Sequence, residues 1–211
     1  MIISHSKEFV FIHIYKVAGT SVRSALRPYA DVTFRRITPR RILYVMGLAS
    51  APADHATARD VRAYWLNDDR FDRYFKFAFV RNPWDWQVSL YHYITSHKLH
   101  PQHRRLCALG SFEKYIMSLN EESVQTQRSF LVDESGELLV DYIGKFETIE
   151  ADFNLVCEKL GVDTVLPQKN VTRRGDFVDY YCDRTSSKIE HLFRDDIKMF
   201  DYQSPTIRLG E

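Results

Sequence analysis

The feature that most constrains this chain is a nearly continuous apolar run that passes at once into a small, hydroxyl-rich turn. Residues 9–14 read FVFIHI, and residues 19–21 read GTS. An unbroken run of β-branched and aromatic residues is typical of a parallel strand that is buried on both faces. Residues 22–26 then have helical spacing, which ends near Pro28. The sequence therefore predicts a strand, a turn and a helix in immediate succession.

A second unit of the same kind begins at residue 74. Residues 74–80 read YFKFAFV and predict a strand. Asn82 is a suitable N-cap and Pro83 a suitable first helical residue, so a helix is expected to follow as far as Thr95. Because strands alternate with helices, we expect an α/β fold with a central, mostly parallel sheet flanked by helices. The chain has 211 residues with no internal repeat or linker, so one domain over residues 1–211 is predicted.

Local patterns predict the remaining elements in less detail. Short strands are expected at residues 138–140 and 142–146. Helices are expected at residues 54–65, 67–73, 111–119, 149–160 and 188–200. Residues 167–183 show no clear period and predict a loop or lid, since long structureless loops are usually functional.

The bulk composition excludes several classes of protein. Twenty-nine basic and 28 acidic residues give a formal charge of +1, which argues against a general nucleic-acid binder. The three cysteines form no CxxC pair, which is typical of a reducing compartment. No run has the length of a signal-peptide core or a transmembrane segment, so we expect a cytoplasmic protein.

The turn after the first strand has the composition of an anion-binding site, and residues 16–21 are called the anion loop below. Backbone N–H groups and the helix dipole favour an anion at a helix start. Gly19 allows close approach, Thr20 and Ser21 add hydroxyl donors, and Lys16 adds a positive charge. An ordinary capped turn explains the same residues. The lysine precedes the glycine, so this is not a GxxxxGK[ST] motif, and GxGxxG is also absent.

The longer segment 11–21, FIHIYKVAGTS, resembles the phosphosulfate-binding segment of carbohydrate-type (family 2) sulfotransferases, whose usual form is HIPKTAGTS. Tyr15 stands in place of its proline and Val17 in place of its threonine. The resemblance implies a sulfotransferase fold similar to that of P-loop NTPases. It also implies the donor 3′-phosphoadenosine-5′-phosphosulfate, whose 5′-phosphosulfate would be bound by Lys16, Val17, Ala18, Gly19, Thr20 and Ser21.

The second strand carries another resemblance to this family. Residues 77–89, FAFVRNPWDWQVS, are similar to the family signature that binds the 3′-phosphate of the donor. The matching residues here are Arg81 and Ser89, and the forked donors of arginine suit a phosphate. Trp84 and Trp86 are expected in the core, with a place beside the adenine as the alternative. Later stretches also resemble bacterial-type members, so the resemblance covers nearly the whole chain.

Sulfuryl transfer needs a group that stabilises the leaving phosphate and a base for the acceptor hydroxyl. Lys16 is the candidate for the first role. His55, within the DHATA stretch at residues 54–58, resembles the histidine that supplies the base in glycan 2-O-sulfotransferases. A solvent-exposed histidine at a helix start is the alternative. Glu147 is a weaker candidate base, and His13 in the first strand is expected to be structural.

The aperiodic segment at 167–183 contains Thr172 and Arg173, which the resemblance predicts to touch the donor. A loop of surface charge is the alternative. No metal is expected, because DxD and HExxH motifs are absent. His97, His100 and His103 recur every three residues, but a proline at position 101 interrupts the helix that would align them.

These observations predict a sulfotransferase that moves the sulfuryl group from 3′-phosphoadenosine-5′-phosphosulfate to a hydroxyl, by in-line displacement with a histidine base. The expected partners are the nucleotide donor and a hydroxyl-bearing acceptor, a glycan by the resemblance. Two alternatives stay open. A small-molecule kinase would need a Walker lysine and magnesium. A non-catalytic nucleotide-binding protein would bind the donor without turnover.

Overall fold

Two compact units, each drawn from two stretches of the chain, make up the computed structural model. The structure describes residues 1–31, 53–167 and 175–207. The first unit joins Met1–Val80 to Gln127–Val171, and the second joins Arg81–Thr126 to Thr172–Glu211. The expectation of one sulfotransferase domain over residues 1–211 stays a prediction.

Among the described residues, the first unit is built on a four-stranded sheet in the order β1-β2-β3-β4. Its strands are β1 (Ile2–Ser4), β2 (Phe9–Ile12), β3 (Phe75–Val80) and β4 (Tyr142–Lys145). β1 runs antiparallel to β2, whereas β2, β3 and β4 run parallel to one another. Every residue of β2 is buried. The predicted α/β class with a mostly parallel sheet is confirmed.

β1 was not predicted from the sequence. Its residues Ile2 and Ile3 are almost fully buried, as is Met1. A three-residue strand is too short to show a period, so only its pairing with β2 reveals it. The turn between β1 and β2 contains Glu8 with φ of 49°, a left-handed conformation that returns the chain onto the sheet.

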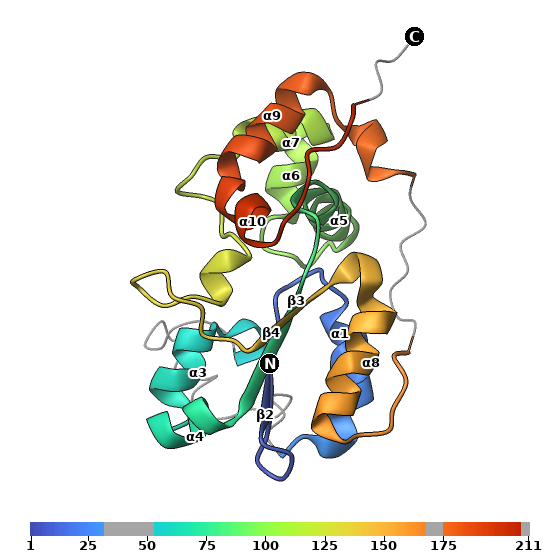
Figure 1. Cartoon of the computed structure of the whole chain (residues 1–211). Helices are drawn as coiled ribbons and strands as arrows, with labels where there is room; N and C mark the ends of the chain where they lie inside the picture. Colours follow the sequence, from blue (N-terminus) through green and yellow to red (C-terminus); the bar gives the residue numbers. More distant parts are fainter. Residues whose placement is uncertain (32–52, 168–174, 208–211) are drawn as a thin grey trace. The chain divides into compact units, whose positions relative to one another are not determined.

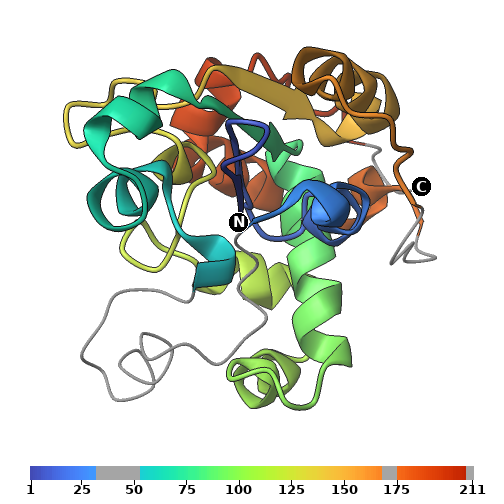
Figure 2. The ribbon, with the colours of Figure 1, turned by 90° about the horizontal axis from the view of Figure 1, so that it is seen from below.

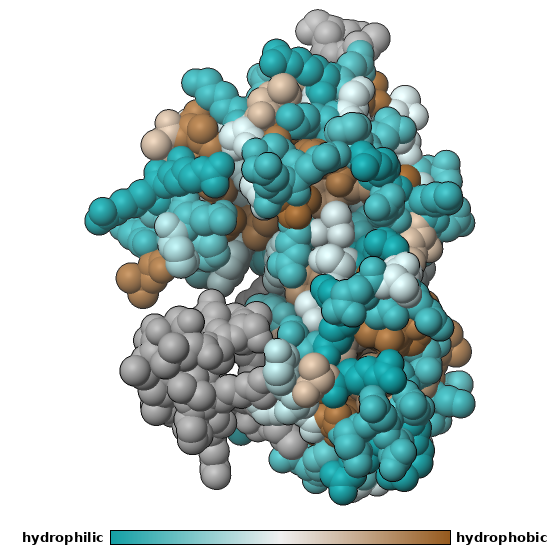
Figure 3. Space-filling model, turned by 90° about the vertical axis from the view of Figure 1, so that its left-hand side faces the viewer, coloured by the Kyte–Doolittle hydropathy of each residue, from teal (hydrophilic) through white to brown (hydrophobic). Residues whose placement is uncertain are grey.

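Helices cover both faces of this sheet. In Figures 1 and 2, α1 and α8 lie on one face, and α3 and α4 lie on the other. The helical segments of the first unit are α1 (Gly19–Leu26), η1 (Arg27–Tyr29), η2 (Ala53–His55), α3 (Ala58–Tyr64), α4 (Asp68–Arg73), η3 (Arg128–Phe130), η4 (Phe146–Thr148) and α8 (Ile149–Leu160). The outward surface on the side of α3 and α4 is mostly hydrophilic (Figure 3), as expected for amphipathic helices.

Capping residues decide where these helices begin and end. The helix expected over residues 54–65 begins only at Ala58, because the Thr57 side chain forms a capping box with Asp60. α8 ends at Gly161, which has φ of 58° and accommodates the left-handed C-cap. The sequence predicted this end correctly.

The second unit is helical in the described residues. Its segments are α5 (Pro83–Ser96), α6 (His103–Leu109), α7 (Phe112–Ser118), η5 (Phe177–Tyr180), α9 (Asp183–Leu192) and α10 (Arg194–Met199). Asn82 caps α5 and Ser111 caps α7, as predicted. Along the described chain, no helix combines the length and apolar composition that crossing a bilayer requires.

Two predicted elements were wrong. Residues 138–140 form no strand, and Leu138 makes only an isolated bridge to Val132. The helix expected over residues 188–200 is two helices, α9 and α10, separated at Phe193. Phe193 is fully buried and its ring lies 5.9 Å from that of Trp86. The packing of this ring therefore outweighs the continuity that the apolar pattern suggested.

Candidate functional site

The anion loop leaves the carboxyl end of the β2 segment in a strained conformation. Lys16 and Ala18 are non-glycine residues with φ of 65° and 59°. Left-handed residues within a turn are typical of backbone nests that bind anions, and such strain concentrates at functional sites. Ala18 is the N-cap of α1, whose first N–H groups have no intrahelical acceptor. The loop therefore has the backbone form of an anion site.

Side chains of the anion loop divide between the core and the surface. Val17 is completely buried, so its side chain serves packing. This explains how valine can stand where the family has threonine. Ser21 is also buried, whereas Thr20 is exposed and Lys16 is partly exposed. The loop thus offers a lysine and a threonine hydroxyl to a ligand in addition to its backbone.

His55 lies against His13 and Tyr15, which directly precede the anion loop, although it follows His13 by 42 positions in the sequence. Its Nδ1 is 2.9 Å from the backbone oxygen of His13. Because a carbonyl only accepts, Nδ1 donates and Nε2 carries the lone pair in the neutral ring. The ring centre of His55 lies 6.0 Å from that of Tyr15, the residue before the anion loop. The candidate base is therefore oriented with an accepting nitrogen.

Burial is the main cause that lowers the pKa of His55 below its ordinary value of 6.5, and the bond to the His13 carbonyl opposes it. Burial also lowers the pKa of His13 well below that value, with repulsion from the Met1 ammonium and His55 adding to it. Both rings are therefore uncharged near neutral pH. A neutral imidazole is the form that accepts a proton from a hydroxyl.

Charged groups surround this histidine pair in the first unit. The Met1 amino group donates to the Asp54 carbonyl at 2.7 Å, and Arg23 lies 3.1 Å from the Asp54 carboxylate. Burial lowers the pKa of the Met1 amine to about 4. The Asp54 carboxylate thus balances the Arg23 charge next to His55.

Arg81 and Ser89 belong to the second unit, where Arg81 is the first residue after β3. Its guanidinium contacts the Asp85 carboxylate at 2.6 Å, through both Nε and Nη2, and both side chains are nearly buried. Ser89, on α5, is 9% exposed. Asp85 and Ser89 are four residues apart on α5 and therefore lie on the same side of that helix. Asp85 was not predicted as a site residue from the sequence, although its i,i+4 spacing from Arg81 could have indicated it.

Comparison with known proteins identifies the chain. A model of the sulfotransferase family matches residues 1–203. The chain belongs to the sulfotransferase family. Searches of curated proteins and of solved structures found no match. The α/β sheet with the anion loop after β2 is consistent with this membership.

Other predicted residues of this sulfotransferase are placed as follows. Trp84 and Trp86 are fully buried, which agrees with the predicted core role. Glu147 lies in η4 and is exposed. Thr172 and Arg173 lie outside the described residues. Within residues 1–31, 53–167 and 175–207, no three His, Cys, Asp or Glu side chains gather as a metal site would require.

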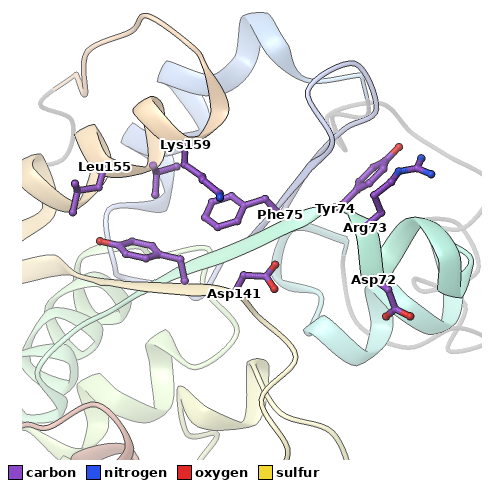
Figure 4. A pocket seen from close by; sticks show the side chains of 9 residues that line it. Asp72, Arg73, Tyr74, Phe75, Asp141, Leu155 and Lys159 are labelled. Atoms are coloured by element: carbon purple, nitrogen blue, oxygen red, sulfur yellow. The ribbon is translucent and has the colours of Figure 1, made fainter.

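A cavity of about 620 Å³ lies elsewhere on the first unit of the sulfotransferase. It is lined by residues at the starts of β3 and β4 and on α8, among them Phe75, Asp141 and Lys159 (Figure 4). The Lys159 ammonium lies 5.9 Å from the Phe75 ring centre, and Lys76 pairs with Asp141 at 3.0 Å. Since parallel strands share their direction, this cavity is at the edge opposite to the anion loop. It is not part of the candidate site.

Proposed function

We propose that this sulfotransferase transfers the sulfuryl group of 3′-phosphoadenosine-5′-phosphosulfate to a hydroxyl of a carbohydrate acceptor. The observation that carries the proposal is the position of His55, whose Nδ1 bonds the His13 carbonyl beside the anion loop. A neutral histidine next to a strained, lysine-containing anion loop supplies the two groups that this chemistry needs. The carbohydrate class rests on the resemblance of residues 11–21 and 54–58 to glycan sulfotransferases.

Donor binding is assigned to both motifs. The backbone and side chains of Lys16, Val17, Ala18, Gly19, Thr20 and Ser21 bind the 5′-phosphosulfate. Arg81 and Ser89 bind the 3′-phosphate, with Asp85 holding the guanidinium. Thr172 and Arg173 are proposed to contact the donor as well, by resemblance alone. The strained φ angles of Lys16 and Ala18 support the first assignment.

The proposed reaction exchanges one S–O bond for another. His55 accepts the proton of the acceptor hydroxyl at Nε2 while the hydroxyl oxygen forms a bond to sulfur. The bond from sulfur to the 5′-phosphate oxygen breaks in line with this attack, by analogy with phosphoryl transfer. Lys16 stabilises the negative charge that develops on the departing phosphate. The products are the sulfated acceptor, adenosine 3′,5′-bisphosphate and a proton on His55.

Donor recognition is tested by thermal shift with adenosine 3′,5′-bisphosphate and, separately, with ATP and magnesium. We expect stabilisation by the bisphosphate. Arg81→Ala should weaken its binding about tenfold or more, because a charge-assisted contact is lost. Arg62→Ala is the matched control, since Arg62 pairs with Asp68 on the surface. Stabilisation by ATP and magnesium alone would favour the kinase alternative and overturn the proposal.

Catalysis is tested by following sulfate transfer to a panel of glycans. His55→Ala should lower kcat by about 10²- to 10⁴-fold, the usual contribution of a general base, while bisphosphate binding is kept. His191→Ala is the control, since His191 lies on α9 against Glu121. Full activity in His55→Ala would move the base elsewhere. Bisphosphate binding with no transfer to any acceptor would favour the non-catalytic alternative.

A further inference from the structure

The side chain of His13 lies directly beneath the turn of the anion loop. His13 is only 7% exposed. A Cβ atom added to Gly19 would lie 1.8 Å from both Cδ2 and Nε2 of the His13 ring. No real Cβ contact is that short, so the imidazole occupies the space that any side chain at position 19 would need.

This contact gives the reason for a glycine at position 19. Gly19 does not have a left-handed φ, unlike Gly110, Gly136 and Gly161. Backbone conformation therefore does not demand glycine there. Glycine is required at position 19 for a steric reason, because the His13 ring leaves no room for a side chain. The loop can therefore pack closely on that ring.

The same residue holds the candidate base. The ring centres of His13 and His55 are 4.5 Å apart, and the His13 carbonyl accepts from His55 Nδ1 at 2.9 Å. On the strand side, the Phe11 ring stacks on His13 at 5.8 Å with an interplanar angle of 23°. His13 is thus held by the sheet and contacts both the anion loop and His55.

We propose that the His13 imidazole is a positioning residue that sets the spacing between the Gly19 turn of the anion loop and the His55 ring. The effect of His13 on catalysis rests on the proposed function, because it concerns the distance from the bound sulfate donor to the base His55. Its structural part, the contact between His13 and Gly19, is independent of any activity.

An uncharged ring suits this position. Among the described residues, the charged and titratable groups that act on the histidine pair are the Met1 amine, Arg23 and Asp54. Arg23 keeps its positive charge, so it would repel a charged imidazole, whereas the Met1 amine is uncharged near neutral pH because its pKa is about 4. The neutral His13 ring also packs against His55, with ring centres 4.5 Å apart, and so contributes to the burial that lowers the His55 pKa. Removing the ring should therefore hydrate His55 and raise its pKa.

The contact is tested by a double-mutant cycle on the full chain, read by binding of adenosine 3′,5′-bisphosphate and by the free energy of unfolding. Gly19→Ala should impair both, because its methyl group meets the ring. His13→Ala removes the obstacle, so the double variant should recover by about tenfold or more in binding relative to Gly19→Ala alone. If Gly19→Ala fails to fold, recovery of folding in the double variant is the supporting result.

Gly144→Ala is the matched control, since its Cβ would lie 2.5 Å from the Phe79 ring in the same unit. His13→Ala should not relieve the defect of Gly144→Ala. Additive losses in the His13 and Gly19 cycle would overturn the proposal. Equal relief of both glycine variants would overturn it too, because the effect would then be general loosening.

The link to the base is tested by the pH dependence of kcat/KM. In His13→Ala, activity should fall at a higher pH on acidification than in the wild type, because His55 becomes hydrated. His13→Leu, which restores apolar volume, should return the pH at which kcat/KM falls toward its wild-type value. A lower rate in His13→Ala with no change in that pH would overturn this role. If the wild type transfers no sulfate, the proposed function fails, whereas the unfolding cycle still decides the contact between His13 and Gly19.

Discussion

Single residues of this protein depart from the family pattern in ways that the structure explains. Val17, within the anion loop, replaces a threonine, and its side chain is completely buried. Tyr15 replaces a proline, and its ring packs edge-on against His55 and Phe130 at 6.0 Å and 5.9 Å. Both residues therefore make packing contacts, Val17 in place of a hydroxyl-bearing side chain and Tyr15 in place of a residue that restricts φ. The anion-loop backbone keeps its left-handed residues despite them.

At this scale, the protonation of His55 should control the pH dependence of sulfate transfer. Burial lowers its folded-state pKa, so the neutral base persists below the ordinary histidine value of 6.5. We expect kcat/KM to be flat near neutral pH and to fall only below pH 6.5 as His55 becomes protonated. Rates measured from pH 5 to 8 check this. A half-maximal value above 6.5 would contradict it.

Among the elements, α3 begins close to the candidate site, and side-chain capping determines where it begins. The capping box of Thr57 and Asp60 begins α3 at Ala58, three residues after His55. Thr57 Oγ1 accepts from the Asp60 N–H at 3.1 Å, and the Asp60 carboxylate accepts from the Thr57 N–H at 2.9 Å. The cap therefore fixes the point at which the chain leaves the site.

Thr57→Ala should destabilise the first unit by about 1 kcal/mol, the usual effect of losing an N-cap side chain. Urea unfolding measures this loss, and sulfate transfer should fall with it because His55 is close in sequence. Ser111→Ala, which removes the cap of α7 in the second unit, should lose similar stability. Equal falls in transfer for both variants would show that the cap does not act through His55.

The join between β4 and α8 depends on one carboxylate. Asp152 accepts from Tyr142 Oη at 2.8 Å, from the Lys145 N–H at 2.8 Å and from Thr148 Oγ1 at 2.7 Å. Asp152→Ala leaves these donors without their acceptor, so a loss of about 2 kcal/mol is expected. Tyr142→Phe removes one bond only and should lose about 1 kcal/mol. Unfolding of both variants in urea tests the order.

At the scale of the whole molecule, buried neutral histidines make stability depend on pH. The folded-state pKa values of His13 and His55 are lowered, so the unfolded chain binds more protons below its histidine pKa of 6.5. Stability is therefore full above this value and is lost as pH falls through it. Between pH 7.5 and 5.5 we expect a loss of about 1 kcal/mol from His13.

Amide hydrogen exchange in β2 measures this loss, because it reports the opening of the first unit separately. His13→Leu should show a smaller loss over the same pH range, since a titrating group has been removed. Equal losses in the wild type and His13→Leu would assign the pH dependence to other groups.

Local rules predicted the fold where their signals are strong. The unbroken runs gave correct positions for β2 and β3, and capping residues gave the starts of α5 and α7 and the end of α8. The same rules missed β1, which is too short to show a period. They also joined α9 to α10, because the apolar pattern continues across Phe193. In both cases tertiary packing outweighs the local pattern.

By itself, the sequence determined the anion loop, its order relative to Arg81 and Ser89, and membership of the sulfotransferase family, now shown by the match over residues 1–203. Each of these depends on residues that are close together in the sequence, and local motifs and periodic patterns are built from such residues. Only the tertiary structure decided that His55 bonds to the His13 carbonyl and that the His13 ring fills the space that a side chain at position 19 would need. The physical reason is that such contacts depend on side-chain packing between segments that the sheet and helices bring together, and no local pattern encodes that distance.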